Sequence, residues 1–280
     1  MKRTVYQLGE VGHAPDHKAF FQFPALTLRE VKEIIADSFG GDFSQSIAVG
    51  AVMNDQRELL GELVMVGGER PYCVGRKGER RPLTDEDKIA FLQLAHFQPH
   101  KETLTLTAQN LQELEDTLAK HLKERHMETA AVKITAQLPS VTFRSLNTEG
   151  AQITPDCCLA GVCEKHQKKF EGTDMTCRLS GFFCAQGAVQ EGTSFDNHTR
   201  ADGTHAPHML HLHGEGRNAA GQNAAGHLLD FSGPATFTLE LMPDIEQWLV
   251  TTREQASAKE GPKWTNRIRT QTTPAAPGKA

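Results

Sequence analysis

HMLHLH at residues 208–213 and AGHLLDF at residues 225–231 say most about the fold and chemistry of this chain. Residues i and i+2 of a β-strand project from the same face, so we expect His211 and His213 to point in one direction. A hairpin-like return through the glycine-rich segment between the two stretches would bring His227 alongside them. Three neutral imidazoles with an open coordination position are typical of a catalytic zinc site. The spacing therefore predicts a β-hairpin that carries a metal centre.

Two other interpretations of these histidines are open at this point. A His-rich loop can bind metal only incidentally, and further histidines lie just upstream, at His198, His205 and His208. A cupin-type dioxygenase site also begins with His-x-His, but its carboxylate ligand usually follows at positions that hold Arg217 and Asn218 here. Glu215 falls too close to His213 to take that role. The spacing therefore disfavours the cupin-type site and leaves the His-rich loop as an alternative.

The bulk composition is typical of an ordinary soluble protein. A chain of 280 residues with 38% hydrophobic residues can bury one large core or two modest ones. The net charge of -5 and the pI of about 6.2 provide no electrostatic attraction to nucleic acid or to an anionic membrane. No apolar run approaches the roughly 20 residues that span a bilayer, and no signal-peptide pattern opens the chain. We therefore expect a cytoplasmic protein whose partner is a small molecule, with no nucleic acid and no membrane involved.

The six cysteines contain no Cys-x-x-Cys pair, which argues against a zinc ribbon and against a thioredoxin-like site. In a reducing cytosol their expected state is the free thiol. Cys177 and Cys184 stand in apolar, strand-like surroundings and are predicted to be core residues. The role of the cluster Cys157, Cys158 and Cys163 is open, with a second metal or a disulfide as alternatives to free thiols.

The hydrophobic pattern predicts a mixture of strands and helices. Residues 27–39 should form a helix that begins with a capping box of Thr27 and Glu30. Residues 46–74 should form strands of a hairpin with a turn at Gly67 and Gly68. A helix with a leucine stripe should follow a strand at 103–106, and Leu111, Leu114, Leu118 and Leu122 make up that stripe. Further extended segments are predicted at 130–143, 176–184, 208–213, 226–231 and 236–241.

Four further segments bear on the organisation of the chain. Pro243 and Asp244 are predicted to start a short helix that runs to about residue 252. Two long polar intervals, 147–172 and 186–206, are long enough to be functional loops. Residues 257–280 contain few large apolar side chains, so we expect most of this tail to be disordered.

Four blocks of the chain, in the right order, resemble the acetolactate decarboxylase family, whose members are zinc enzymes that convert 2-acetolactate to acetoin and carbon dioxide. The histidine segments 208–213 and 225–231 are similar to the family's GYHLHF and GGHVLDF. LLGELVMVGGERPY at 59–72 is similar to the family's LDGELIVLDGxxY. The stretch from AVKI to FRSL at 131–146 and TCRLSGFF at 176–183 also resemble family segments. The likeness extends over most of the chain.

This resemblance implies a metal site and two catalytic residues. It implies that His211, His213 and His227 bind Zn²⁺, although iron, cobalt and manganese also accept three imidazoles. It places Glu62 on the family's active-site glutamate and Arg144 on its catalytic arginine. Without the resemblance, Glu62 would be interpreted as an exposed turn residue and Arg144 as half of a surface ion pair.

The implied chemistry follows from these residue types. The planar fork of Arg144 suits a substrate carboxylate or a developing oxyanion. Glu62 lies between two apolar strand halves, and partial burial would favour its acid form and allow it to supply the proton that completes acetoin. The expected substrate is therefore a 2-hydroxy-3-keto acid and the expected activity that of a metal-dependent carboxy-lyase; a homodimer is compatible with the sequence.

Several departures from the family pattern leave the substrate open. The loop between His213 and His227 is a few residues longer than usual, Leu60 stands where the family has Asp, and residues 186–207 form an expanded stretch. The family also has a glutamate near its C-terminus at the metal, for which Glu254 and Glu260 are the candidates here. The alternatives are the same fold and metal acting on a different 2-hydroxy-3-keto acid, and a non-catalytic relative that binds metal or ligand.

The resemblance also implies the fold class, an α/β protein of the α+β type. A mixed sheet in an N-terminal half, residues 1–130, would pack on a mainly antiparallel, metal-bearing sheet in a C-terminal half, residues 131–256. Residues 257–280 would form the disordered tail.

Overall fold

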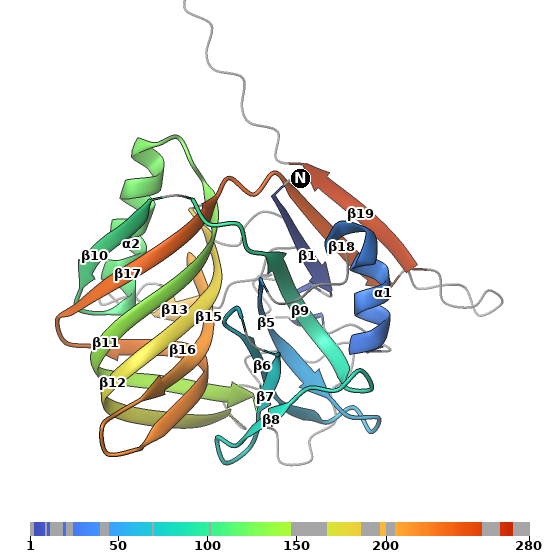
Figure 1. Ribbon diagram of the computed structural model, residues 1–280, viewed down its shortest axis with the longest axis horizontal. Helices are drawn as coiled ribbons and strands as arrows, with labels where there is room; N and C mark the ends of the chain where they lie inside the picture. The colour runs from blue at the N-terminus through green and yellow to red at the C-terminus, as the bar shows by residue number, and fades with distance from the viewer. Residues whose placement is uncertain are drawn as a thin grey trace, which may run out of the picture.

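Two β-sheets that pack face to face, with one helix on the outside of each, form the fold (Figure 1). The structure is a computed structural model. It describes residues 3–8, 10–11, 19–20, 25–39, 45–68, 70–100, 102–146, 167–185, 197–199, 205–253 and 264–270. The arrangement confirms the predicted α+β class, with a mixed sheet packed on an antiparallel one. Neither helix in this part of the chain has the length and apolar character that a membrane crossing requires.

The first sheet has nine strands in the order β19-β18-β1-β9-β5-β6-β7-β8, with β4 paired to β9. Only the pair β1–β18 is parallel among those described, and this pair makes the sheet mixed. Its strands are β1 (Thr4–Leu8), β4 (Leu26–Thr27), β5 (Ser46–Met53), β6 (Leu59–Met65), β7 (Tyr72–Val74), β8 (Arg80–Pro82), β9 (Lys88–His96), β18 (Gln247–Arg253) and β19 (Trp264–Thr270).

The central strands of this sheet are buried on both faces. All eight residues of β5 are buried, and their side chains alternate between two clusters. Ala48 and Val52 pack toward helix α1 (Leu28–Phe39), whereas Ile47 and Val49 pack toward the second sheet. A strand that is covered on both faces has a nearly continuous apolar sequence instead of an alternating one. The run IAVGAVM in β5 has this composition.

Helix α1 begins with the predicted capping box. The Glu30 backbone N–H donates to Thr27 Oγ1 at 3.1 Å, and the Thr27 N–H donates to Glu30 Oε2 at 2.7 Å. These reciprocal bonds satisfy two backbone donors at the first turn, where no helical partner exists. The predicted hairpin turn is confirmed too, since Gly67 and Gly68 adopt φ of 88° and 76°.

The second sheet is antiparallel and partly closed on itself. Its strands follow the order β10-β17-β11-β12-β15-β16, and β16 also pairs with β11. The 18-residue β11 makes this closure possible, because residues 130–136 pair with β17 while residues 140–144 pair with β16. The strands are β10 (Thr103–Ala108), β11 (Thr129–Leu146), β12 (Gln167–Cys184), β15 (Leu210–Arg217), β16 (Asn223–Ser232) and β17 (Ala235–Pro243).

Helix α2 (Leu111–Glu124) packs on the outer face of this sheet. Its N-cap residue Asn110 accepts a hydrogen bond from the Glu113 N–H at 2.9 Å. The predicted leucine stripe is buried and belongs to the same cluster as residues from β11, β12, β15, β16 and β17.

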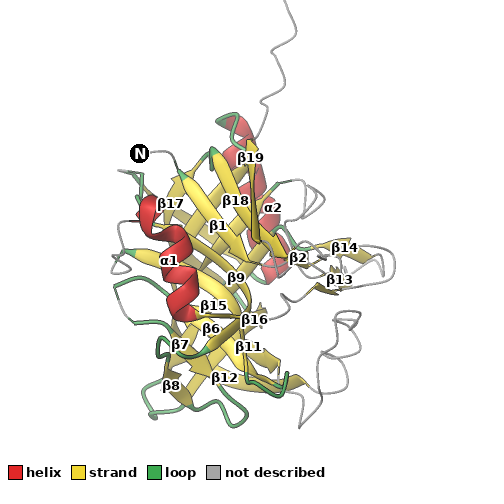
Figure 2. Cartoon of the chain, turned by 90° about the vertical axis from the view of Figure 1, so that its right-hand side faces the viewer, coloured by secondary structure: helices red, strands yellow, loops and turns green. Residues whose placement is uncertain are grey.

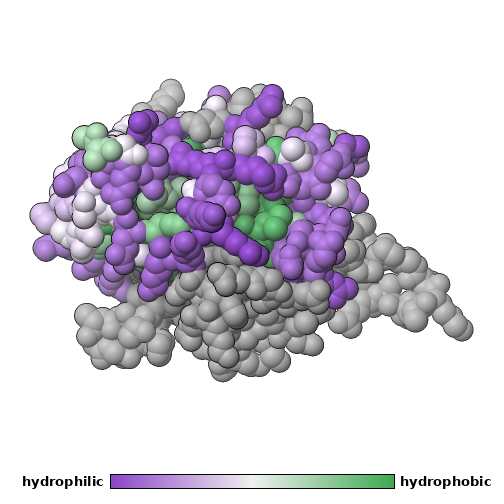
Figure 3. Space-filling view, turned by 90° about the horizontal axis from the view of Figure 1, so that it is seen from below, coloured by the Kyte–Doolittle hydropathy of each residue, from purple (hydrophilic) through white to green (hydrophobic). Residues whose placement is uncertain are grey.

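Seen from below, the described surface is mainly hydrophilic, with hydrophobic side chains visible in its recesses (Figure 3). Two small pairings, β2 (Glu10–Val11) with β3 (Ala19–Phe20) and β13 (Asn197–Thr199) with β14 (His205–Pro207), complete the strands (Figure 2).

The helix predicted from Pro243 to about residue 252 is wrong. Pro243 ends β17, Asp244 takes a φ of 53°, and Gln247–Arg253 form strand β18. Val5 of β1 pairs with Trp248, so the partner that makes this segment a strand lies near the other end of the chain. A local signal, such as a proline at the first position of a helix, contains no information about a pairing strand so far away in the sequence.

The two sheets do not divide the chain at residue 130. β10 and α2, which precede this position, belong with the second sheet, whereas β18 and β19 return to the first. Part of the tail predicted to be disordered is a strand, β19. This segment is ordered by its pairing with β18 along seven residues. The rest of that tail, most of the two polar intervals, the cluster Cys157, Cys158 and Cys163, and the candidates Glu254 and Glu260 lie outside the described residues.

Candidate metal centre

Three buried histidines meet between the two sheets. His211 and His213 lie on β15, and His227 lies on β16 directly opposite His213 in the antiparallel register. One ring nitrogen of each lies within 4.8 Å of the others, and the three side chains are the group in the described part of the chain that could hold a metal ion. Their residues are only 8%, 1% and 5% exposed. The hairpin predicted from the sequence therefore does bring these imidazoles together.

The distances between the ring nitrogens fit one metal ion. His213 Nε2 lies 3.2 Å from His211 Nε2 and 3.3 Å from His227 Nδ1. Zn–N bonds of about 2.0–2.1 Å in a tetrahedral site separate two nitrogens by about 3.4 Å. Both distances from His213 thus agree with the spacing that a first-row transition metal requires.

The outer ring nitrogens set the tautomers that a metal requires. His213 Nδ1 lies 2.7 Å from the Leu63 carbonyl oxygen, which can only accept, so this nitrogen carries the proton. His211 Nδ1 donates in the same way to Gln93 Oε1 at 3.2 Å. The two Nε2 lone pairs then face each other across 3.2 Å and cannot hydrogen-bond to each other. A shared cation would convert this repulsion into coordination, so the residues present fit a metal ion.

Two glutamines behind His211 were not among the sequence candidates. Gln93 on β9 and Gln7 on β1 pair in register, are fully buried, and are joined by a hydrogen bond of 3.2 Å from Gln93 Nε2 to Gln7 Oε1. The Phe91 ring stacks on the His211 ring at 6.0 Å between centroids. The available signal was a polar residue that interrupts an otherwise apolar strand, as in KIAFLQLAH. Such a residue must find a buried partner, and here the partner is a metal-ligand candidate.

Glu62 lies beside this histidine group. It stands on β6, is 2% exposed, and its Oε2 lies 3.8 Å from His213 Nε2. Gly61 adopts a φ of 150°, and a Cβ atom there would lie 1.9 Å from the Val74 carbonyl oxygen of β7. Only glycine allows β7 to approach so closely at the residue before Glu62. The interpretation of Glu62 as an exposed turn residue is therefore wrong.

Arg144 lies on the other side of His227. It stands on β11 directly opposite His227, and paired residues of antiparallel strands project from the same face. The residue is 7% exposed, which does not agree with a surface ion pair. Gly226 adopts a φ of 133°, and a Cβ there would lie 2.1 Å from the Arg144 carbonyl oxygen. The glycines that precede Glu62 and His227 thus have the same function, to let two strands approach closely at a site residue.

Glu215, the residue weighed for a cupin-type site, is engaged elsewhere. Its carboxylate accepts a hydrogen bond from the Tyr72 hydroxyl at 2.9 Å and lies 2.5 Å from Arg80 Nη1 and 3.6 Å from Arg178 Nη1. These contacts join β7 and β8 of the first sheet to β12 and β15 of the second. Glu215 is therefore an ion-pair residue between the sheets and is not part of the histidine group.

The segment between His213 and His227 forms a regular hairpin. Residue pairs continue from His213 and His227 out to Arg217 and Asn223, and the exposed turn lies beyond them. At about 3.4 Å per residue the turn lies roughly 15 Å from the metal candidates. Extra length at this turn therefore does not line the histidine group.

The remaining thiols and histidines whose side chains the structure describes do not extend the site. Burial raises the pKa of the Cys73 and Cys177 thiols to about 12, so both are neutral core residues. Cys184 is buried as well. The prediction that Cys177 and Cys184 are core residues is therefore confirmed. His208 binds Glu115 on α2, at 3.0 Å, and not the histidine group. The His198 and His205 side chains lie outside the described part of the structure.

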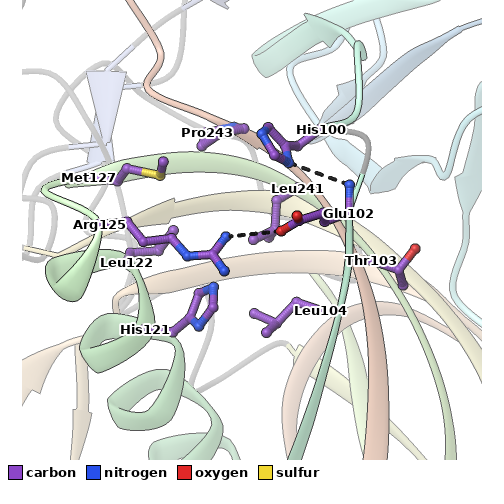
Figure 4. A pocket seen from close by; sticks show the side chains of 10 residues that line it. All are labelled: His100, Glu102, Thr103, Leu104, His121, Leu122, Arg125, Met127, Leu241 and Pro243. Atoms are coloured by element: carbon purple, nitrogen blue, oxygen red, sulfur yellow. Dashed lines mark hydrogen bonds and ion pairs between the residues drawn. The ribbon is translucent and has the colours of Figure 1, made fainter.

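A hollow with an empty volume of about 400 Å³ lies beside the C-terminal end of α2, away from the histidine group (Figure 4). Its lining combines apolar side chains from α2, β10 and β17 with the polar residues His100, Glu102, His121 and Arg125. These polar residues do not form a metal-ligand group in the described part of the chain.

The family assignment rests on a match across most of the chain. The family described as alpha-acetolactate decarboxylase matches residues 54–258. The chain belongs to the alpha-acetolactate decarboxylase family. The predicted resemblance is thereby confirmed, and the matched range includes both strands that carry the histidines. No curated protein matches the chain.

Solved structures from this family share the fold. Alpha-acetolactate decarboxylase from Bacillus subtilis strain 168 is 16% identical, the match covers 88% of each chain, and the TM-score is 0.58. Acetolactate decarboxylase from Bacillus subtilis subspecies spizizenii has the same identity and coverage and a TM-score of 0.57. A Staphylococcus aureus protein of unknown function, similar to alpha-acetolactate decarboxylase, is 16% identical with a TM-score of 0.56 and covers 85% of this chain and 86% of its own.

Proposed function

We propose that this protein is a metal-dependent carboxy-lyase that converts 2-acetolactate to acetoin and carbon dioxide, with zinc as the metal. One observation carries the proposal. In a member of this family, the Glu62 carboxylate lies 3.8 Å from one of three buried histidines, and the buried Arg144 is paired with another, His227, on the adjacent strand. The observation also speaks against a non-catalytic relative, because a protein that only binds metal has no need of a buried acid and a buried guanidinium beside it.

The donor set suits the chemistry of decarboxylation. When bound, a divalent ion would act as a Lewis acid toward the substrate's ketone and hydroxyl oxygens. Neutral imidazoles of His211, His213 and His227 would leave the positive charge of the ion undiminished, and His211 and His213 are in the tautomers that such ligands need. Imidazole donors favour zinc, and they accept cobalt, iron or manganese as well.

Arg144 would bind the substrate's carboxylate. A guanidinium presents parallel N–H donors that match the two oxygens of a carboxylate, and the match is strongest where water is excluded. Arg144 meets this condition, since it is buried beside His227. A substrate whose carboxylate is held there would place its ketone and hydroxyl oxygens toward the histidine group.

Glu62 would supply the proton. When the bond between the carboxylate carbon and its neighbour breaks, carbon dioxide leaves and the bonding electron pair stays on that neighbour. This carbon must then gain one proton to become acetoin. Glu62 in its acid form can donate that proton, because its carboxyl group lies 3.8 Å from His213, a candidate metal ligand.

The experiment is to incubate metal-replete protein with racemic 2-acetolactate and to measure acetoin. Protein stripped of metal with a chelator and protein reloaded with zinc provide the matched controls. We expect acetoin above the spontaneous background in the loaded protein only. Absence of acetoin from the loaded protein would contradict the proposed substrate and would direct the assay to other 2-hydroxy-3-keto acids.

A further inference from the structure

Helix α2 contributes no residue to the histidine group, yet it packs directly behind both strands that carry it. Leu212 lies between His211 and His213 and faces the opposite layer, as strand alternation requires. Leu228 follows His227 in the same way. Both leucines belong to the cluster that contains Leu114 and Leu118 of α2. The side of each strand that faces away from the proposed metal therefore faces the hydrophobic cluster to which this helix contributes.

Glu115 of α2 binds the segment just before the first histidine of the group. Its residue is fully buried, and a single carboxylate oxygen, Oε1, accepts hydrogen bonds from two backbone N–H groups. These belong to Met209 at 2.9 Å and Leu210 at 3.0 Å, and the His208 ring nitrogen Nδ1 lies 3.0 Å from the same oxygen. The contacts end one residue before His211.

Asp230 makes a corresponding link from the other strand. It lies on β16, three residues after His227, and its Oδ1 accepts a hydrogen bond from the Leu111 N–H at the start of α2, at 3.1 Å. The same oxygen accepts from the Phe231 N–H at 2.8 Å. Helix α2 is therefore hydrogen-bonded to both strands, next to the residues that would bind metal.

We propose that α2 sets the position of these two strands relative to each other, and that Glu115 is a positioning residue for the metal-binding histidines. The proposal rests on the proposed metal centre. Without Glu115, two buried N–H groups would lose their acceptor, and the start of β15 would shift until they found another. Because His211 follows directly, the shift would change the separation of its ring nitrogen from those of His213 and His227. A tetrahedral ion tolerates little change in that separation.

The test measures metal affinity rather than turnover. Glu115→Ala and Glu115→Asn both withdraw the acceptor oxygen from β15, whereas Glu115→Gln keeps an oxygen in the same place. Ile35→Ala, in the buried face of helix α1 on the first sheet, controls for general destabilisation. Asp116→Asn removes a carboxylate from the exposed face of α2. Zinc dissociation constants from chelator competition, the visible spectrum of the cobalt-loaded protein, and Tm without metal are recorded for each.

We expect Glu115→Ala and Glu115→Asn to weaken zinc binding about 10–100-fold and to alter the cobalt spectrum, as loss of outer-shell partners does. Glu115→Gln should restore most of the affinity. Ile35→Ala should lower Tm at least as much, yet leave the zinc affinity within about twofold of the parent. Asp116→Asn should likewise leave the zinc affinity within about twofold of the parent.

Three results would overturn the proposal. They are parent-like zinc affinity in the alanine and asparagine variants, an equal loss in Ile35→Ala, or equal affinities of the asparagine and glutamine variants. The last comparison decides the matter if Glu115→Ala does not fold. A parent protein that binds no metal would instead contradict the proposed function, so the two failures are distinguishable.

Discussion

The centre between the sheets and the hollow at the end of α2 contain the same kinds of side chain. The centre contains His211 and His213 of β15 and His227 of β16. Glu62 of β6 and Arg144 of β11 lie beside them. The hollow has His100, His121, Glu102 and Arg125 (Figure 4). In the hollow, Glu102 and Arg125 have side chains that are 70% and 44% exposed and lie 3.8 Å apart. In the centre, every one of the five residues is buried.

The difference between these two regions lies in what holds the side chains and in how much water they meet. His211 and His213 are each fixed by an acceptor behind the ring, Gln93 and the Leu63 carbonyl. His100 accepts a weak hydrogen bond of 3.4 Å from the Glu102 N–H, and an exposed ion pair such as that of Arg125 contributes little energy. Residue types alone therefore do not make a metal centre; burial and fixed ring orientation do.

The largest expected effect comes from removing the central ligand. His213→Ala should reduce the zinc content of the purified protein to background and abolish turnover, because its Nε2 lies within 3.3 Å of both other ring nitrogens. His121→Ala, in the hollow, should leave both unchanged. Elemental analysis of the two variants makes the comparison, and undiminished zinc in His213→Ala would remove this residue from the site.

Exchanging the buried acid should separate metal binding from proton transfer. Glu62→Gln should keep its zinc and lose about 10²–10⁴-fold in kcat, since an amide cannot donate the carboxyl proton. Glu102→Gln is the matched change in the hollow and should turn over like the parent. Zinc content and acetoin formation are measured together. Full activity of Glu62→Gln would contradict the proton-transfer role.

Arg144 in the centre and Arg125 in the hollow can be compared in the same way. Arg144→Ala should lower kcat/KM about 10²–10³-fold, and Arg144→Lys should recover little of it, because an ammonium lacks the planar fork. Arg125→Ala should remain within error of the parent. Steady-state kinetics on acetolactate, with Tm as a check on folding, give the answer. Unchanged efficiency of Arg144→Ala would rule out the carboxylate contact.

Gln93 tests the outer shell of the centre. Gln93→Ala removes the acceptor behind His211 and should weaken zinc binding about 10–100-fold. Gln112→Ala, on the surface of α2, is the matched control and should leave zinc binding unchanged. Chelator competition measures both. Parent-like affinity in Gln93→Ala would show that the His211 ring is held by packing, including the stack with Phe91, and not by this hydrogen bond.

The smallest effect concerns the hollow itself. Burial, together with the neighbouring Arg125 charge, lowers the pKa of His121 below its usual value of 6.5. As pH falls through about 6.5, the unfolded chain therefore takes up this proton more readily than the folded protein, and stability decreases. His121→Gln removes this titration, so its Tm should fall less than that of the parent between about pH 8 and pH 5. An identical decline in both proteins would contradict the assignment.

Much of the fold could be predicted because its signals are local. The capping box at Thr27, the leucine stripe of α2 and the glycine turn at Gly67 each depend on neighbours a few residues away. The segment after Pro243 was predicted wrongly because its strand character comes from pairing with β1. The division at residue 130 differs from the sheets for the same reason, since sheet membership is a contact between distant segments.

The sequence by itself determined the identity and spacing of the three histidines, the glycines before Glu62 and His227, and the family to which these motifs belong. Alternation along a strand is enough to place His211 and His213 on one face. Only the tertiary structure decided that Glu62 and Arg144 are buried beside them, that Gln93 and Leu63 orient the rings, and that Glu115 reaches β15 from α2. The physical reason is that hydrogen bonds and burial at such a site join residues tens to more than a hundred positions apart, and no local pattern encodes those contacts.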